Sequence, residues 1–482
     1  MNFTIDTINT LDTNKIGFFR FKKLPNASII ITNDAGKFHF FSDKDFKNFL
    51  SGDVEKLSNY SDLVKKGFIK DTGYQEKLVG SVAMKNHFVG IGPTLHMVVT
   101  TLRCNHKCKY CHAAVAPMSA KQFDMDEDTA RKVVDAILHT NSQSLTIEFQ
   151  GGESLVNYPI VQFITEYATT RAQHLQKQLS FSIVTNLTLM SEEKLSWLLD
   201  HQVDICTSLD GDELSHNNNR TGYEGNSFEM VSYWIKRVSE EKQKRGMGKI
   251  GALLTVTKET LPRYREIIDA YIDLDLDSIF LRWLNPYGFA ASDLRTLAYK
   301  DDEWIDFYKK SLDYIIELNK KGIKFKESMT MVYLMKIFSS IDPGYMDIRS
   351  PSGIAIGGVA YNYDGKVYAS DESRMLGRMG IEDFFMTELQ ETGKDTYGAM
   401  MNSDITKIAV QSSCLDGLPG YNEHAYKPFV GVDIIHNFKT KGNIYYPYKK
   451  DNKFYLQEAI LDYIFEKLQN PETEKILLDW LQ

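Results

Sequence analysis

Cysteine is scarce in this sequence, and long apolar runs are absent. Five cysteines in 482 residues are too few for a disulfide scaffold. No run of roughly 18 apolar residues occurs, which excludes a typical transmembrane helix, and the first residues lack the charged and apolar segments of a secretion signal. Internal repeats and long low-complexity linkers are missing as well. These absences predict a globular, cytoplasmic protein that has no membrane partner.

Positive charge is also in short supply. The 56 lysines and arginines are outnumbered by 64 aspartates and glutamates, which gives a formal net charge of −8 at pH 7. This balance argues against a general surface for nucleic acids or anionic membranes. With 43% apolar and 25% charged residues the chain is typical of globular proteins, and its length allows about two to four domains, or one barrel with large appendages.

Three of the five cysteines stand close together, in the stretch TLRCNHKCKYCHAA. Cys104, Cys108 and Cys111 form a C-x3-C-x2-C run, and three thiolates on one loop can bind a soft metal centre with one coordination position left open. Zinc is one interpretation, with His106 or His112 as the fourth ligand. A 4Fe-4S cluster with three cysteine-bound irons is favoured, because closed zinc sites usually draw ligands in pairs from two loops. Its fourth iron is then open to a small molecule.

Apolar segments rich in β-branched residues alternate with helical patterns from residue 95 onward. The predicted strands cover residues 95–102, 145–149, 179–184, 203–209, 250–256 and 278–284, and the helical patterns between them include 126–140, 191–201 and 261–274. Six strands alternating with helices predict an α/β fold, a partial (β/α)6 barrel of the TIM type. Each strand ends in a polar or glycine-rich loop, so we expect a small-molecule site at the C-terminal rim.

Two motifs at consecutive strand ends resemble those of the radical S-adenosylmethionine (SAM) superfamily. Tyr110 precedes the last cysteine, as in the superfamily's C-x3-C-x-aromatic-C loop, and Gly151, Gly152 and Glu153 match its Gly-Gly-Glu signature at the end of the second strand. The resemblance implies that SAM binds the open iron through its amino and carboxylate groups. It also implies that the Gly-Gly-Glu segment receives the methionine amino group, with glycines where the backbone lies close to the ligand.

The peptide-modifying branch of the superfamily implies further SAM contacts. By resemblance, Ser208 contacts the ribose and Arg220 the carboxylate. Leu281 and Tyr110 are expected to lie beside the adenine. The other two expected SAM-binding residues are Gln150 and Asn186. The alternative is that each is only a turn residue at a strand end.

Long stretches resemble the radical SAM maturases of the His-Xaa-Ser system, over nearly the whole chain. They include FFRFKKLPNASIIITNDAGKFHFFS, IFLRWLNPYGFA, GVAYNYDGKVYASDESRML and the segment from SCLDGLPG to AYKPFVG. The resemblance implies a ribosomally synthesised precursor peptide, with His-Xaa-Ser repeats, as the substrate. One alternative is a radical SAM enzyme that acts on a small molecule or a nucleic acid. Another is a non-catalytic peptide-binding scaffold, against which the intact cysteine and Gly-Gly-Glu motifs argue.

The C-terminal region resembles a SPASM-like extension that has lost its cluster ligands. Its hairpin survives as YNYDGKVYASDE, with Asp364 and Gly365 as a two-residue turn. Ser370 stands where many relatives place a cysteine. The later ligand positions read Cys414, Tyr421, His424, Val430 and Asp433. One cysteine and one histidine are too few for a four-iron cluster, so a single cluster is predicted, with no auxiliary cluster.

Asp371 is the candidate catalytic proton acceptor. In related peptide-oxidising enzymes an aspartate follows the hairpin cysteine and takes a proton from the radical product, and a carboxylate in a dry site can act as a base. The alternative is a solvated acid beside Glu372. Cys414 is either a core residue, a relic of a ligand or a radical quencher, whereas Cys206 lies in mid-strand and is expected in the core.

The sequence divides into four regions. Residues 1–92 are predicted to form an N-terminal α+β module, 93–325 the partial barrel, 326–448 the SPASM-like extension and 449–482 C-terminal helices. The first region, with three short strands followed by helices, resembles peptide-recognition modules that take a leader peptide by adding a strand to a sheet edge. The alternative is a structural cap for the barrel.

The resemblance implies an oxidoreductase-type enzyme. An external donor such as a flavodoxin or ferredoxin reduces the cluster, SAM is cleaved to a 5′-deoxyadenosyl radical, and the radical abstracts hydrogen from the peptide. The cofactors supply the difficult chemistry and the protein positions the substrate. The product is a crosslink, an oxidised residue or an epimer. Without auxiliary clusters, epimerisation and hydrogen-return chemistry gain weight over net two-electron oxidation.

Overall fold

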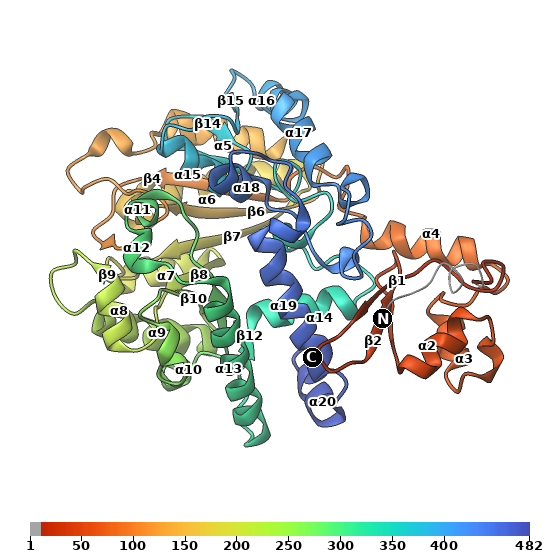
Figure 1. Ribbon diagram of the computed structural model, residues 1–482. Coiled ribbons are helices and arrows are strands. Elements are labelled where there is room, and N and C mark those ends of the chain that lie inside the picture. Colours follow the sequence, from red (N-terminus) through yellow and green to blue (C-terminus); the bar gives the residue numbers. More distant parts are fainter. Residues whose placement is uncertain (1–10) are drawn as a thin grey trace.

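A ten-stranded sheet runs through the centre of the computed structural model, which describes residues 11–482 (Figure 1). Its order is β12-β11-β10-β8-β7-β6-β4-β13-β14-β15. The strands are β4 (Leu95–Thr101), β6 (Ser144–Gly151), β7 (Gln178–Thr185), β8 (Val203–Ser208), β10 (Gly251–Thr255), β11 (Ser278–Arg282), β12 (Lys326–Glu327), β13 (Gly358–Tyr361), β14 (Lys366–Tyr368) and β15 (Phe385–Glu388). The first seven are mutually parallel, and all six predicted strands are confirmed.

Helices between these strands bury one face of the sheet. On β6, Leu145, Ile147 and Phe149 belong to the main hydrophobic core, whereas Glu148 and Gln150 point to the opposite face, because side chains alternate along a strand. The helices are α5 (Glu127–Leu138), α6 (Tyr158–Leu175), α7 (Glu192–Asp200), α8 (Glu213–Asn219), α9 (Ser227–Lys244), α10 (Tyr264–Asp273), α11 (Gly288–Ser292), α12 (Leu294–Leu297) and α13 (Asp301–Lys320).

The starts of the predicted helices follow from capping residues. Asp126 accepts a hydrogen bond from the backbone N–H of Thr129 at the start of α5, and Ser191 does the same for Lys194 in α7. These side chains satisfy backbone donors that have no partner inside the helix. The helical patterns predicted at 126–140 and 191–201 are thereby confirmed.

The predicted hairpin continues the sheet on the far side of β4. Strand β13 pairs in parallel with β4 and antiparallel with β14, and the turn between them places Gly365 at φ +83°, a conformation that favours glycine. The hairpin prediction is confirmed. The remaining helices are α14 (Ser328–Phe338), α15 (Asp371–Arg378), α16 (Gly393–Asn402), α17 (Asp404–Ser413), α18 (Ile434–Lys441), α19 (Asn452–Lys467) and α20 (Pro471–Asp479).

The N-terminal region forms a small module with its own core. Its antiparallel sheet has the order β1-β2-β3, which confirms the three short strands predicted here. The elements are β1 (Arg20–Lys23), β2 (Ile29–Thr32), β3 (Phe38–Phe41), α2 (Asp43–Leu50), α3 (Tyr60–Lys65) and α4 (Tyr74–Lys85). Phe41, Phe46 and Phe49 lie at its centre.

The module lies against the C-terminal part of the chain (Figure 1). Lys22 of β1 forms ion pairs with Glu458 at 2.6 Å and Asp462 at 2.7 Å, both on α19. Thr32 donates a hydrogen bond to the carbonyl oxygen of Ala425. Among residues 11–482, no helix is long and apolar enough to cross a membrane.

Candidate active site

The three clustered cysteines lie on the loop that follows β4, at the carboxyl end of the parallel strands. The loop is held by backbone hydrogen bonds: Cys104 donates to Ala116, and a short ladder between β5 (Lys107–Cys108) and β9 (Arg220–Thr221) places Cys108 opposite Arg220. These contacts join residues far apart in the sequence to the cysteine loop. They position it where the sequence analysis expected a site.

Gly151 and Gly152 allow the end of β6 to pack on the backbone that leads into this loop. A Cβ atom on Gly151, whose φ is +138°, would lie 2.1 Å from the carbonyl oxygen of Thr101, and one on Gly152 would lie 2.3 Å from that of Arg103. The N–H groups of Gly152 and Glu153 donate to these same two carbonyls at 2.8 Å. Close backbone packing within the chain therefore requires glycine at both positions. The predicted approach of a ligand would be a second requirement at the same place.

Glu153 ties the ends of β6 and β7 together. Its buried carboxylate accepts hydrogen bonds from Leu155 N at 3.0 Å, Thr185 Oγ1 at 2.6 Å and Asn186 N at 2.7 Å. Burial raises the pKa of this carboxyl, while the three hydrogen bonds act in the opposite direction. Glu153 therefore positions Asn186 at the end of β7.

Asn186 in turn contacts the cysteine loop. Its Nδ2 donates to Asn105 Oδ1 at 2.9 Å and to His106 Nδ1 at 3.0 Å, and it lies 3.9 Å from Cys104 Sγ. The other ring nitrogen of His106 lies 2.9 Å from Ser227 Oγ. Both nitrogens of His106 are thus engaged with protein groups.

Cys108 adjoins a buried network that includes Arg220 and Tyr110. Arg220 Nη1 lies 3.9 Å from Cys108 Sγ, and its Nε forms a 3.1 Å ion pair with Asp210. Tyr110 donates a 2.5 Å hydrogen bond to Asp210, and the Arg220 guanidinium lies 5.6 Å from the centre of the Tyr110 ring. Sequence reasoning missed Asp210, two residues after Ser208 in the segment SLDG. The signal was present, because a carboxylate just after a strand end of this fold is a candidate site residue.

The three thiols lie in surroundings that suit a metal cluster. Burial raises the pKa of each, that of Cys108 to about 12. Donors nevertheless face the sulfurs: His106 N lies 3.4 Å from Cys104 Sγ, Arg220 lies beside Cys108, and the backbone N–H groups of residues 113–115 favour the Cys111 thiolate. Such donors stabilise cluster-bound thiolates.

The described residues offer no closed site for a single ion. Among residues 11–482, no three or more His, Cys, Asp or Glu side chains are grouped as ligands of one metal ion. His112, the other candidate zinc ligand, has a buried Nε2 without a hydrogen-bond partner. The donor set fits a 4Fe-4S cluster, in which each of three thiolates binds its own iron.

Other expected SAM-binding residues occupy different faces of the sheet. Ser208 and Gln150 lie on the polar face, and Gln150 donates a hydrogen bond to Glu148. Leu281 lies in the main core on the opposite face, because it alternates with Phe280 and Arg282 along β11.

Asp371, the predicted proton acceptor, lies in the first turn of α15. Its carboxylate forms a 2.8 Å ion pair with the buried Arg374. Ser370 caps the same helix through a reciprocal hydrogen bond with Ser373, so a serine at this position has a structural role.

Three further carboxylates lie nearby and are named here the acid cluster: Asp347, Glu372 and Asp433. Burial and mutual repulsion raise the pKa of all three, those of Asp347 and Asp433 to about 6. Lys453 lies among them, and the attraction between opposite charges partly offsets the rise. Sequence reasoning did not group these residues, because they come from distant segments.

The other positions of the degenerate extension carry ordinary contacts. Tyr421 donates to Asp451 at 2.8 Å, His424 lies 3.1 Å from Glu458, and Val430 is in the core. Cys414 is half-buried beside the end of α17. Cys206 is half-buried in β8 and belongs to none of the hydrophobic core clusters among residues 11–482, so the expectation that it lies in the core is wrong. It alternates with the buried Ile205 and Thr207 and therefore points to the opposite face of the sheet. The absence of an auxiliary cluster stays a prediction.

Comparisons with known proteins agree with this geometry. The model of the Radical SAM superfamily matches residues 98–269. An uncharacterized protein of Methanocaldococcus jannaschii, MJ0907, is 31% identical over 121 residues, which are 25% of this chain and 40% of that protein. The radical SAM cyclopropyl synthase TigE of Paramaledivibacter caminithermalis is 23% identical over 53% of each chain. The chain thus covers less than two thirds of these two relatives.

A longer match is the cysteine-type anaerobic sulfatase-maturating enzyme of Clostridium perfringens, 24% identical over 61% of this chain and 78% of that protein. Among solved structures, anSMEcpe with bound AdoMet has a TM-score of 0.63 at 16% identity, covering 81% of this chain and 98% of that one. Streptococcus suis SuiB bound to precursor peptide SuiA has a TM-score of 0.52 at 10% identity, covering 90% and 98%. The chain has the radical SAM fold, with a mixed central sheet flanked by helices.

Proposed function

Given the radical SAM domain over residues 98–269, we propose that this protein is a maturase that modifies a ribosomally synthesised peptide. One observation carries the proposal: three thiols on one loop, each facing a hydrogen-bond donor, packed against the Gly-Gly-Glu segment. The likeness to SuiB bound to precursor peptide SuiA, and to anSMEcpe with a Cp18Cys peptide, supports a peptide substrate. Within this class we propose a substrate with His-Xaa-Ser repeats.

The cofactors of this proposal are one 4Fe-4S cluster, held by Cys104, Cys108 and Cys111, and SAM. When bound, and after reduction by a flavodoxin or ferredoxin, they supply a 5′-deoxyadenosyl radical that removes hydrogen from the peptide. The proposed SAM-binding residues are Tyr110, Gln150, Gly151, Gly152, Glu153, Asn186, Ser208, Arg220 and Leu281.

The residues of the chain orient these groups. Arg220 is held by Asp210 through Nε and Nη2, and its Nη1 lies beside the Cys108 sulfur. In this proposal its positive charge also attracts the SAM carboxylate. Asn186 is fixed by Glu153 beside Cys104. Asp371, held 2.8 Å from Arg374, accepts the substrate proton in this proposal.

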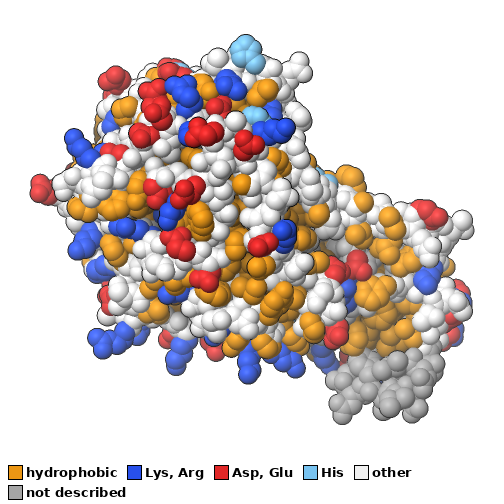
Figure 2. All heavy atoms as spheres, turned by 90° about the horizontal axis from the view of Figure 1, so that it is seen from above, with side chains coloured by type: hydrophobic (Ala, Val, Ile, Leu, Met, Phe, Trp, Pro, Cys, Tyr) orange, Lys and Arg blue, Asp and Glu red, His pale blue; other side chains and the backbone are white. Residues whose placement is uncertain are grey.

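Peptide recognition by the N-terminal module is the second element of the proposal. Strand β3 lies at the edge of its sheet. Its residues line a hollow of about 460 Å³, together with other side chains that include Phe338. An extended peptide can add to such an edge through main-chain hydrogen bonds. Figure 2 shows hydrophobic side chains grouped on the lobe that this module forms.

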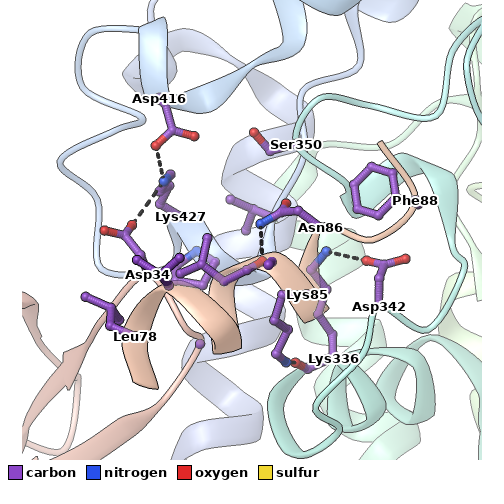
Figure 3. Close-up of a pocket in the computed structure, with 16 residues that line it drawn as sticks. Asp34, Leu78, Lys85, Asn86, Phe88, Lys336, Asp342, Ser350, Asp416 and Lys427 are labelled. Atoms are coloured by element: carbon purple, nitrogen blue, oxygen red, sulfur yellow. Dashed lines mark hydrogen bonds and ion pairs between the residues drawn. The ribbon is translucent and has the colours of Figure 1, made fainter. Parts of the chain in front are cut away.

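A second hollow of about 480 Å³ lies between α4 and the C-terminal loops (Figure 3). Helix α4 buries none of its residues, and Val79 is 67% exposed. Lys427 bridges Asp34 of the module and Asp416 of the C-terminal region at one end of the hollow. The exposed apolar side chains of Val79 and Met84 on this helix support a recognition role over that of a simple cap.

The test is anaerobic reconstitution of the full chain, with a Cys104→Ala, Cys108→Ala, Cys111→Ala variant beside it. About four irons per chain and 5′-deoxyadenosine formation after reduction are expected for the wild type, and neither for the variant. A mass change of a His-Xaa-Ser peptide incubated with the reduced, SAM-loaded enzyme is the expected result for the substrate. Zinc in place of iron, or no SAM cleavage, would refute the proposal.

A further inference from the structure

The hollow between α4 and the C-terminal loops, named here the α4 hollow, combines an apolar wall with charged ends (Figure 3). Helix α4 supplies the apolar wall through Leu78, Val79, Val82 and Ala83, which recur on one face of the helix at the spacing of its turns. Val430 of the C-terminal region also lines the hollow. At about 480 Å³ the hollow is large enough for several side chains, and its ligand must be partly apolar.

Lys85, the last residue of α4, is the one lysine of the lining without a carboxylate partner. Among residues 11–482, no aspartate or glutamate oxygen lies within 4.0 Å of its ammonium group, whereas Lys336 and Lys427 both form ion pairs. Its Nζ donates to the carbonyl oxygen of Lys336 at 2.5 Å, and a Cβ atom on Gly36 would lie 3.5 Å from the same Nζ. Since an ammonium group has three N–H donors, this fixed side chain can accept a further partner.

Every carboxylate that lines the hollow is already paired. The three carboxylates are those of Asp34, Asp342 and Asp416, and the cations within 4.0 Å of them are Arg20, Lys336, Arg349 and Lys427. With Lys85, five cations stand against three carboxylates, which leaves a local excess of two positive charges. The whole chain, in contrast, has a net charge of −8. An anionic group complements the local excess.

The pKa of Lys85 agrees with this charge balance. Burial and repulsion from Lys336 and Lys37 lower the pKa to about 8, and attraction to Asp342 offsets only part of the shift. A carboxylate beside the ammonium group would favour the charged form of the lysine. The charges around Lys85 therefore favour an anionic partner.

Apolar side chains continue from the hollow along the outside of α4. Val79 lines the hollow and is exposed, as are Met84 on α4 and Val89 in the turn that follows it. A small anion would leave these side chains in water, whereas a peptide segment can cover them and reach Lys85 with one acidic side chain.

We propose that the α4 hollow binds a segment of the precursor peptide in which an acidic residue adjoins apolar residues. The acidic side chain pairs with Lys85, and the apolar side chains pack on Val79 and Val82. This inference rests on the proposed function and names the chemistry of the peptide segment that is recognised outside the cysteine loop.

The experiment compares (Leu-Glu-Ala)3, (Leu-Gln-Ala)3 and (Ser-Glu-Ala)3, all with blocked ends. Binding to the full chain, loaded with cluster and SAM, is measured by isothermal titration calorimetry. The first peptide is expected to bind at least about tenfold more tightly than either of the others, equivalent to about 1.4 kcal/mol. No binding of the first peptide, or equal affinity of any other, overturns the inference. The net charge of −8 opposes general attraction of an acidic peptide, so a preference for glutamate indicates a local cation.

Variants locate the effect. Lys85→Gln is expected to weaken (Leu-Glu-Ala)3 at least about tenfold and to leave (Leu-Gln-Ala)3 unchanged. Val79→Ser is expected to weaken both at least about threefold, because it removes apolar contact. Lys77→Gln is the matched control: Lys77 lies on the same helix, pairs with Asp71 at 2.6 Å and does not line the hollow, so neither affinity is expected to change. A folded Lys85→Gln variant, checked by circular dichroism, that still prefers glutamate would overturn the inference.

A second copy of the chain is the competing occupant. Sedimentation of the wild type tests it: a dimer that Val79→Ser abolishes would overturn the inference, because the hollow would then be an interface between copies. Failure of the inference is also separable from failure of the proposed function. If a His-Xaa-Ser peptide is modified while the glutamate and glutamine peptides bind equally, the acidic subsite is wrong and the proposed function stands. If the peptides discriminate and no modification occurs, the opposite holds.

Discussion

Replacing Asp433 by asparagine is expected to stabilise the protein at neutral pH. Burial and repulsion from Asp347 and Asp451 outweigh attraction to Lys453, and they raise the pKa of Asp433 from 3.8 to about 6. At about 1.4 kcal/mol per pKa unit, ionisation of this carboxyl opposes folding by about 2–3 kcal/mol at pH 7.5. Asparagine removes the charge and still caps α18, where Asp433 accepts from His436 N at 2.8 Å.

The sign of the pH dependence follows from the raised pKa. The protonated form is favoured in the folded state, so the wild type loses stability as the pH rises from about 4 to above 6. The difference between Asp433→Asn and wild type is therefore expected to be near zero at pH 4 and to reach its full value above pH 7. Urea unfolding of the cluster-loaded protein across this range measures it.

Asp126→Asn is the matched control, because Asp126 also caps a helix but is largely exposed. Its hydrogen bond from Thr129 lowers its pKa, so its charge stabilises the folded state above pH 4 and its neutral variant gains nothing at pH 7.5. Two results would refute the reasoning about burial and repulsion. One is an Asp433→Asn variant that is no more stable than the wild type at pH 7.5. The other is a gain in the free energy of unfolding that is as large at pH 4 as at pH 7.5.

Two further predictions concern the cysteine loop. Gly152→Ala is expected to lower the cluster content, measured as iron per chain, at least severalfold, because its Cβ would lie 2.3 Å from the Arg103 carbonyl oxygen. Gly80→Ala is the control and is expected to keep the iron content of the wild type, because its Cβ would have no atom within 4 Å. Arg220→Ala leaves Asp210 buried without its cation and is expected to lower the free energy of unfolding by about 3–5 kcal/mol. The double variant with Asp210→Asn is expected to recover part of this loss in urea unfolding, and additive effects would contradict the network.

The strands and the cysteine loop could be predicted because their signals are local. Apolar and polar residues alternate along 145–149, and this pattern indicates a strand that is buried on one face. The three cysteines are equally easy to recognise, because they stand within one short segment. The Gly-Gly-Glu segment could be placed at a strand end for the same reason. The packing of its glycines on the backbone near Thr101 could not, because that contact depends on the register of β4 and β6.

The acid cluster has no local signal, because Asp347, Glu372 and Asp433 are brought together only by the packing of the C-terminal region. The same is true of Lys22, which pairs with acids more than 400 positions away. Asp210 is an intermediate case, since its strand end was predicted and its pairing with Arg220 was not. Sequence patterns thus indicate which strand ends carry chemistry, while tertiary contacts decide which charges meet there.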